Sequence, residues 1–302
     1  MSQNDSSKKV VKDTIALKSG FPLPKGELVL DDAVIMNDTD VESVDFDAKY
    51  AYACHLGVDI IVLHPDYDFS QGLPKIVFDK DEISKWSSMT EFFNFLILDG
   101  SFELGIRYYG FEKFLSMILK KSDEIKDFIK WVTKINFEAA SMASDLGIDG
   151  IMIADDIAYQ GGLIIRPSLF KDLFLSSLER QVEHGDKKNL TAFFHSDGNY
   201  LSILDDIVNA GFKGIHCIDR TCNMELSSLK DYSDKLCLWG HLDVTHIEES
   251  KTESGMKNIA EDIRSATDFK GFILGTNSGI FPGMDVCQLK KIYNHITKES
   301  DI

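Results

Sequence analysis

The residues best suited to chemistry in this chain lie in the sequence His195-Ser196-Asp197-Gly198-Asn199. An imidazole and a carboxylate two residues apart can act as an acid/base and its partner, or as two ligands of a metal ion. Gly198 permits a tight turn, and Asn199 can cap a following helix. The same residues also suit a plain turn that holds a hydrogen-bonded histidine, so the motif alone leaves both interpretations open.

Short apolar runs recur along the chain, and most of them end in polar side chains. The runs cover residues 60–63, 95–98, 151–154, 192–194, 215–218, 236–240 and 272–275. Continuous apolar runs of this kind are typical of parallel strands that are buried on both faces. In a (β/α)8 barrel, the active site is built where such strands end. We therefore expect the polar groups to meet in one ring.

These strand ends supply the candidate site residues. The candidate catalytic residues are His195, Asp156 and Asp197, of which His195 and Asp197 are also candidate metal ligands. The candidate substrate-binding residues are His64, Asp66, Asp99, Tyr159, His241 and Asn277. Asp155 and Asp156 are adjacent, and neighbouring side chains of a strand point in opposite directions. We therefore expect at most one of the two to face the pocket, with the other capping a helix or binding backbone amides.

Helical patterns lie between the apolar runs. Apolar residues three and four apart predict helices over 125–143 and 170–182, and a further one over 201–208 that ends before Gly211. Alternating strands and helices indicate an α/β fold with a parallel sheet. We predict a single (β/α)8 TIM-type barrel, with its eighth strand in 26–46 or near 70–90. The alternative is a doubly wound open sheet, which would gather its site at one switch point.

The length of 302 residues suits one barrel domain with a short extension. Residues 1–24 are expected to be a flexible N-terminal extension, and residues 25–302 the barrel. We see no apolar segment typical of a signal peptide or a membrane span. The five cysteines are an odd number in a long chain, which argues against a disulfide scaffold and favours a cytoplasmic location.

The chain is acidic, with a formal net charge of −17. Nucleic acids and anionic membranes need a basic surface, so neither is expected as a partner. Arginine is scarce and unevenly distributed, because none precedes Arg107.

The order of the motifs resembles the uroporphyrinogen decarboxylase superfamily. That superfamily contains decarboxylases and methyltransferases that work with corrinoid proteins. The matching segments are 100–103, 110–115, 149–160, 166–170, 195–199, 203–211, 226–230, 238–243 and 271–282. The resemblance covers roughly residues 45–298 and implies a (β/α)8 barrel.

The scarcity of arginine helps to distinguish between the decarboxylase and methyltransferase branches of this superfamily. The decarboxylases carry an Arg-rich N-terminal segment that grips the many carboxylates of the substrate, and this chain has no arginine there. A polycarboxylate substrate needs such cationic groups. The resemblance therefore favours a methyltransferase that moves a methyl group between a small-molecule donor or acceptor and a corrinoid protein, which carries the cobalamin. A uroporphyrinogen decarboxylase, which is a lyase, and a non-catalytic barrel with a binding role are the alternatives.

One group of these methyltransferases holds zinc with a His-x-Cys pair and a later cysteine. His195 matches the histidine, Asp197 stands at the first cysteine position, and the later position falls near Asn277 or Ser278. Zinc also accepts histidine nitrogen with carboxylate oxygen, so a zinc site on His195 and Asp197 stays open. A site without a tightly bound cofactor is the alternative. A homodimer is also compatible with the sequence.

Overall fold

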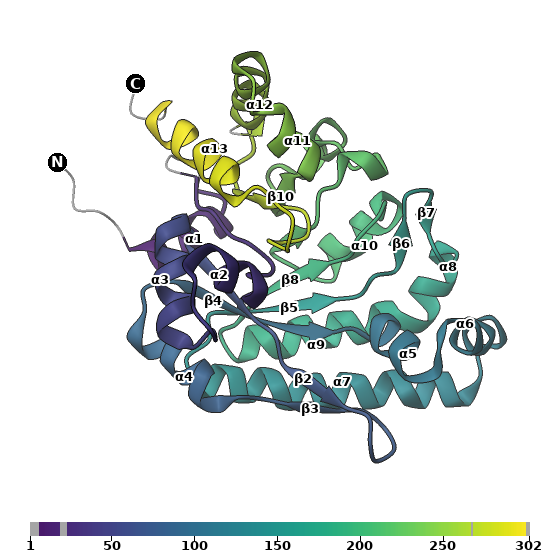
Figure 1. Cartoon of the computed structure of the whole chain (residues 1–302). Helices are drawn as coiled ribbons and strands as arrows, with labels where there is room; N and C mark the ends of the chain where they lie inside the picture. The colour runs from purple at the N-terminus through teal and green to yellow at the C-terminus, as the bar shows by residue number, and fades with distance from the viewer. Residues whose placement is uncertain (1–5, 19–22, 267, 300–302) are drawn as a thin grey trace.

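The computed structural model describes residues 6–18, 23–266 and 268–299, and a curled parallel sheet lies at its centre (Figure 1). In order across the sheet, the strands are β1 Ile60–Leu63, β4 Phe93–Asp99, β5 Gly150–Ala154, β8 Thr191–His195, β9 Gly214–His216, β10 Cys237–Leu242 and β11 Phe272–Thr276. Each predicted apolar run overlaps one of these strands. Neighbours in the sheet follow one another along the chain, so each crossover connects adjacent parallel strands, as in a TIM-type barrel.

A short N-terminal segment, and not an eighth strand, joins the two edges of the sheet. Lys25 forms a parallel bridge to Leu274 in β11, and Gly26 forms one to Ile60 in β1. The amide of Gly26 donates to the carbonyl oxygen of Leu274 at 3.0 Å. The predicted barrel of eight full strands is therefore seen only as seven strands and this bridging segment.

Local chemistry explains why the bridging segment is short. Pro24 has no amide hydrogen to donate to a sheet. A side chain on Gly26 would begin 2.8 Å from the indole ring of Trp239, so only glycine fits where the segment passes the barrel interior. The stretches in which we expected the eighth strand otherwise form helix α2 Asp32–Thr39, the antiparallel pair β2 Asp66–Asp68 and β3 Lys75–Val77, and helix α4 Lys80–Met89.

Helices cover the outside of the sheet, with α7 and α9 along one side and α11 to α13 at the other end of the molecule (Figure 1). The bounds are α3 Phe46–Leu56, α5 Ser101–Tyr109, α6 Phe111–Lys120, α7 Asp123–Asp145, α8 Pro167–Phe170, α9 Ser176–Lys187, α10 Leu204–Asn209, α11 Val244–Glu249, α12 Glu253–Ala266 and α13 Val286–Glu299. A π-helical segment, η1 Lys171–Leu175, joins α8 to α9, and the 3-10 helices are η2 Leu201–Ile203, η3 Arg220–Cys222 and η4 Leu226–Tyr232. The three predicted helices are confirmed.

The extension that we expected to be flexible contains a packed helix, α1 Ser7–Ile15. Its Val11 is fully buried, and the helix packs on β1, β4 and β11. Lys8 and Lys12 both pair with Asp149, which immediately precedes β5, at 3.0 and 3.1 Å. The helix therefore covers the amino-terminal ends of the strands, because its apolar residues are spaced to bury one face. Residues 1–5 and 19–22 of the expected extension lie outside the described residues.

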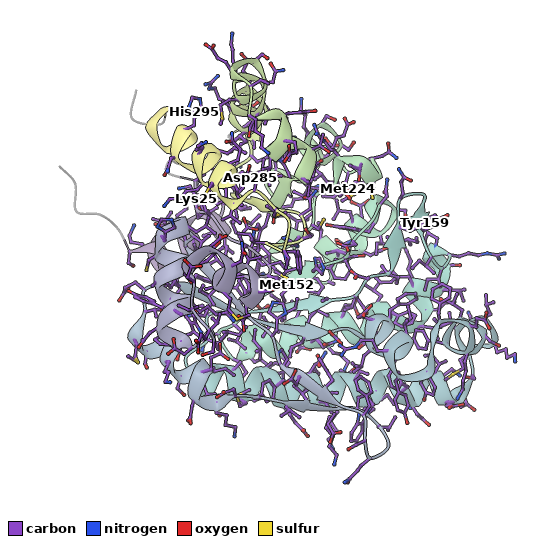
Figure 2. The ribbon with its side chains drawn as sticks, in the orientation of Figure 1. Lys25, Met152, Tyr159, Met224, Asp285 and His295 are labelled. Carbon is purple, nitrogen blue, oxygen red and sulfur yellow. The ribbon has the colours of Figure 1, made fainter. Side chains whose placement is uncertain are left out.

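The barrel interior is filled by large apolar side chains from the strands. Phe95, Met152, Phe193 and Trp239 pack together there, and Figure 2 shows Met152 at the centre of the molecule. Burying a side chain of this size contributes roughly 1.5–3 kcal/mol to stability. With the interior filled and α1 over the amino-terminal ends, the carboxyl ends of the strands are left to form a site.

Among the described residues, no helix combines the length and the apolar composition needed to cross a bilayer. All five cysteines are free thiols.

Candidate functional site

Three candidate residues converge at the carboxyl ends of the neighbouring strands β5 and β8. His195 is the last residue of β8, Asp156 follows the end of β5, and Asp197 follows His195 by two positions. Nε2 of His195 lies 3.7 Å from Oδ1 of Asp156. One ligand atom from each of the three residues lies within 4.8 Å of the others. This group can hold a metal ion, since imidazole nitrogen and carboxylate oxygen are both common zinc ligands.

The turn after β8 holds this group in place. The amide of Asp197 donates to Oδ1 of Asp156 at 2.9 Å, which ties the two strand ends together. Gly198 has φ +79°, and a Cβ there would lie 2.5 Å from the amide nitrogen of Tyr159. Tyr159 belongs to the small antiparallel pair β6 Ala158–Tyr159 and β7 Gly162–Leu163. The glycine thus permits both the left-handed backbone and the close approach of two chain segments.

Asp155 and Asp156 have separate roles, as their adjacency predicts. Asp155 is buried, and its Oδ1 accepts from the amides of Phe102 and Glu103 at 2.7 and 2.9 Å, at the start of α5. Burial raises the pKa of Asp155 to about 8, although the two amide hydrogen bonds act in the opposite direction. Asp156 is the one that faces His195.

Further carboxylates make the surroundings of His195 acidic. Burial raises the pKa of Asp197 and of Asp99. Burial also raises the pKa of Glu103 to about 7, and the charges of Asp156 and Asp99 add to that effect. The side chain of Arg107 donates a hydrogen bond to Asp99. Glu103 was not predicted as a site residue; its signal in the sequence is its place in the first turn after the β4 strand end.

A second histidine, His216, supports His195 from inside the barrel, and it too was missed. The parallel register pairs His195 in β8 with His216 in β9, and their Nδ1 atoms lie 2.9 Å apart. Nε2 of His216 lies 3.3 Å from the carbonyl oxygen of Thr276 in β11. Burial holds the pKa of His216 well below its ordinary value. A histidine within an apolar run is the only sequence signal for this contact, because the register between strands decides its partner.

Residues 98–298 match the model of the uroporphyrinogen decarboxylase family, and this is two thirds of the chain. The chain belongs to this family. No curated protein sequence matches it.

Solved structures from several enzymes share the fold of this family member. A methyltransferase from Methanosarcina mazei has a TM-score of 0.75 and 15% identity, over 98% of this chain and 99% of that one. A putative vitamin-B12-independent methionine synthase from Listeria monocytogenes has a TM-score of 0.58 and 10% identity, over 93% and 98% of the two chains. A D-allulose 3-epimerase from Methylomonas sp. has a TM-score of 0.54 and 12% identity, over 93% and 100%. At these identities the likeness establishes the fold alone.

The remaining predicted residues lie at varying positions around the centre of the site. His64 follows β1, and its Nε2 forms a hydrogen bond of 2.8 Å with the carbonyl oxygen of Leu28. It is also close enough to His195 for the charges of the two side chains to interact. Asp99 is near enough to Asp156 for the charge of Asp156 to raise its pKa. Tyr159 is largely exposed at the edge of the molecule (Figure 2), and Asp66 lies exposed on the β2–β3 pair. Their predicted roles in substrate binding stay predictions.

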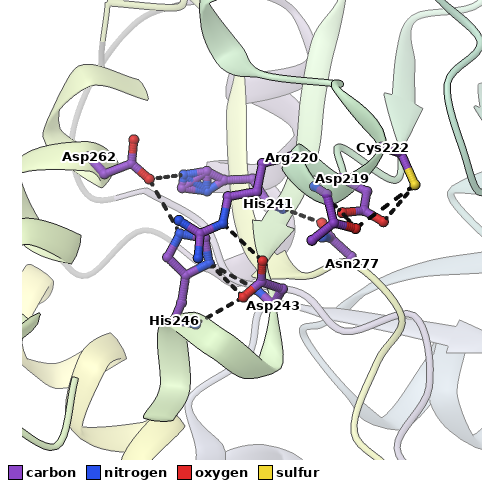
Figure 3. A network of polar contacts seen from close by, with 9 residues as sticks. Asp219, Arg220, Cys222, His241, Asp243, His246, Asp262 and Asn277 are labelled. Carbon is purple, nitrogen blue, oxygen red and sulfur yellow. Dashed lines mark hydrogen bonds and ion pairs between the residues drawn. The ribbon is translucent and has the colours of Figure 1, made fainter. Parts of the chain in front are cut away.

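His241 points away from the expected ring and joins a separate polar network (Figure 3). Its φ of +93° turns the side chain toward the helices, where Nε2 lies 3.0 Å from Asp262 in α12 and the ring stacks on His246 in α11. Burial lowers the pKa of His241 to about 4, although the charge of Asp262 opposes this. The side chain of Asn277 accepts from the amide of His241 at 2.9 Å, so it stabilises this turn.

The network around His241 borders a cavity of about 670 Å³ between β10, η4 and α12. Arg220 donates to Asp243 at 3.0 Å, and Asp243 accepts from the amide of His246 at 2.9 Å (Figure 3). Despite its burial, the hydrogen bonds to Asp243 and Asp262 raise the pKa of His246. The cavity lies on the outer side of the sheet, apart from the His195 group.

Proposed function

We propose that this chain is a methyltransferase that moves a methyl group between a small molecule and a corrinoid protein. The observation that carries the proposal is the convergence of Asp156, His195 and Asp197 on one point at the strand ends. Family membership supports it, because the superfamily that the sequence resembles contains corrinoid-dependent methyltransferases. The fold shared with a methyltransferase from Methanosarcina mazei is consistent with this branch.

The donor set of this group fits zinc. His195 would supply Nε2, and Asp156 and Asp197 one carboxylate oxygen each, which leaves a fourth position for substrate. Zinc bound there would stabilise negative charge on the heteroatom that gives up or accepts the methyl group. Asp197 stands at the first cysteine position of the related methyltransferases, whereas Asp156 follows a different strand from the one that carries their later cysteine. With two carboxylates and no thiolate, the proposed site is a harder, oxygen-rich one.

Glu103 is suited to handle the proton of the reaction. When a methyl group leaves a heteroatom, the bonding electron pair stays on that heteroatom, which then takes up a proton. A carboxyl group with a pKa of about 7 is partly protonated at neutral pH, so it can give up a proton and take one back. Glu103 lies in electrostatic reach of Asp156 and Asp197, so it borders the place where the substrate would bind.

The electrostatics of the site argue against a porphyrinogen substrate. Asp156 and Asp197 would repel a polycarboxylate, and Glu103 would do so once it has lost its proton. Arg107 does not offset them, because it is bound to Asp99 and lies over the ring of Tyr67 at 4.9 Å. We expect no conversion of uroporphyrinogen, as judged by chromatography of the products. Efficient formation of coproporphyrinogen would instead assign the chain to the decarboxylases.

The direct test combines metal analysis with a screen for methylation of cob(I)alamin. We expect the purified protein to bind zinc and to transfer methyl groups from one of the screened donors. His195→Ala should lose both properties and keep its fold, since a residue at a strand end contributes less packing than the layers beneath it.

His55→Ala is the matched control, because it removes an exposed imidazole on α3 that contacts Lys290. It should keep its zinc and its activity. If His195→Ala instead keeps normal metal content and turnover but melts at a much lower temperature, His195 is a structural residue and the proposal fails.

A further inference from the structure

A chain of hydrogen bonds crosses the top of the barrel from β11 to His195. The carbonyl oxygen of Thr276 lies 3.3 Å from Nε2 of His216, and Nδ1 of His216 lies 2.9 Å from Nδ1 of His195. His216 is fully buried, and its ring packs edge-on against Trp239 at 5.0 Å between centroids. Thr276 is itself held by hydrogen bonds to Glu27. The chain therefore consists of buried groups with fixed positions.

These contacts determine which nitrogen of each ring carries a hydrogen. A carbonyl oxygen can only accept, so Nε2 of His216 must donate to Thr276. A neutral imidazole has one N–H, which leaves Nδ1 of His216 as an acceptor. Nδ1 of His195 must then be the donor across the 2.9 Å contact. In neutral His195 the free electron pair therefore sits on Nε2, on the side of Asp156.

Without His216, the surroundings of His195 would favour the opposite arrangement. Nε2 of His195 faces Oδ1 of Asp156 at 3.7 Å, and a carboxylate attracts an N–H. That contact is longer than a hydrogen bond, and the Asp156 side chain is 41% exposed. The contact between His195 and His216 is shorter and buried, so it determines which nitrogen of His195 carries the hydrogen.

We propose that His216 is a positioning residue that keeps the hydrogen of His195 on Nδ1 and leaves the Nε2 electron pair free for a ligand. A metal-binding histidine commonly has its other nitrogen bound to a carboxylate, a carbonyl or water; here a second histidine, backed by a backbone carbonyl, takes that place. The consequence for metal affinity rests on the proposed function, whereas the position of the hydrogen does not.

The position of the hydrogen can be measured by nitrogen-15 NMR of the histidine rings in the metal-free protein at a pH where His195 is neutral. The expected result is a hydrogen on Nδ1 of His195 in the wild type. His216→Leu removes the acceptor and fills its place with an apolar side chain. In this variant the hydrogen of His195 should move wholly or partly to Nε2. A hydrogen on Nε2 in the wild type overturns the proposal, whether or not the variant folds.

A second measurement compares zinc dissociation constants. His216→Leu should bind zinc about 10- to 100-fold more weakly, the usual effect of losing such a supporting contact. His216→Asn keeps an acceptor oxygen near the position of Nδ1, so its affinity should stay within a few fold of the wild type. Equal affinities in all three proteins overturn the positioning role. Failure of the wild type to bind zinc contradicts the proposed function, while the NMR result still decides the tautomer.

Discussion

At the scale of single residues, carboxyl groups of one type take different roles because their surroundings differ. Asp155 accepts two backbone amides and caps α5, whereas Asp156 faces His195. Asp99 is paired with Arg107. Burial and the charges of Asp156 and Asp99 raise the pKa of Glu103 to about 7, and together they outweigh the opposing charge of Arg107. Groups with perturbed pKa values beside a cluster of ligands are candidates for proton transfer.

The variant Glu103→Gln tests whether Glu103 transfers a proton during the reaction. A carboxyl group with a raised pKa is protonated below pH 7 and loses its proton above it. If Glu103 donates a proton, methyl transfer by the wild type should fall as the pH rises through about 7. The variant should lose that pH dependence and be about 100- to 10,000-fold slower. Glu112→Gln, which changes an exposed residue of α6, should match the wild type. An unchanged rate and pH profile in Glu103→Gln would exclude the role.

At the scale of elements, the turn after β8 decides whether the site exists. The turn ties Asp197 to Asp156 and packs against β6 through Gly198. The turn after β10 has the opposite effect, because the positive φ of His241 directs that side chain to α11 and α12. Two strands with similar apolar-to-polar sequences therefore place their histidines on different sides of the sheet.

Gly198→Ala should disrupt the turn after β8. Its Cβ would combine left-handed backbone strain with a contact of 2.5 Å to the backbone of Tyr159, which together cost about 2–5 kcal/mol of unfolding free energy. Gly72→Ala is a matched control, because φ there is +78° but nothing lies within 4 Å. That variant should be destabilised by the backbone strain alone, which costs about 1–2 kcal/mol of unfolding free energy. Equal losses on chemical denaturation would show that Gly198 is not a packing requirement.

At the scale of the whole molecule, the barrel is closed by few contacts far apart in sequence. Glu27 lies in the segment that bridges β1 and β11, and it is buried. Its side chain accepts hydrogen bonds from Thr276 at the end of β11 and from Tyr293 in α13. Burial raises the pKa of Glu27 to about 7, although these hydrogen bonds oppose it. One carboxyl group thus connects the N-terminal segment, the last strand and the last helix.

The closure should make stability dependent on pH. The folded state holds the Glu27 proton more tightly than the unfolded state, so its contribution is complete below pH 4.5 and is lost as the pH rises to about 7. The shift corresponds to about 3 kcal/mol. Glu27→Gln keeps the shape without the charge, so the wild type should lose stability relative to this variant across that range, by up to about 3 kcal/mol. The unfolding free energies of both proteins are measured by chemical denaturation at several pH values. A difference between the two proteins that stays constant from pH 4.5 to 7.5 would contradict the prediction.

The sequence by itself determined the seven strands, the main helices and the family. Apolar runs and three-to-four spacing are properties of neighbouring residues, and burial follows from them directly. It also identified the His195 motif and the separation of Asp155 from Asp156, since adjacent side chains of a strand diverge. The packed helix α1 was missed because its burial depends on the barrel beneath it.

Only the tertiary structure decided which polar groups share a site. The pairing of His195 with His216 follows from the register of β8 and β9, which no local pattern contains. The direction of His241 depends on the φ of a single residue. The sheet closes through Lys25 and Gly26 without a full eighth strand, because long-range contacts to both edges hold a segment too short to be recognised from its own sequence.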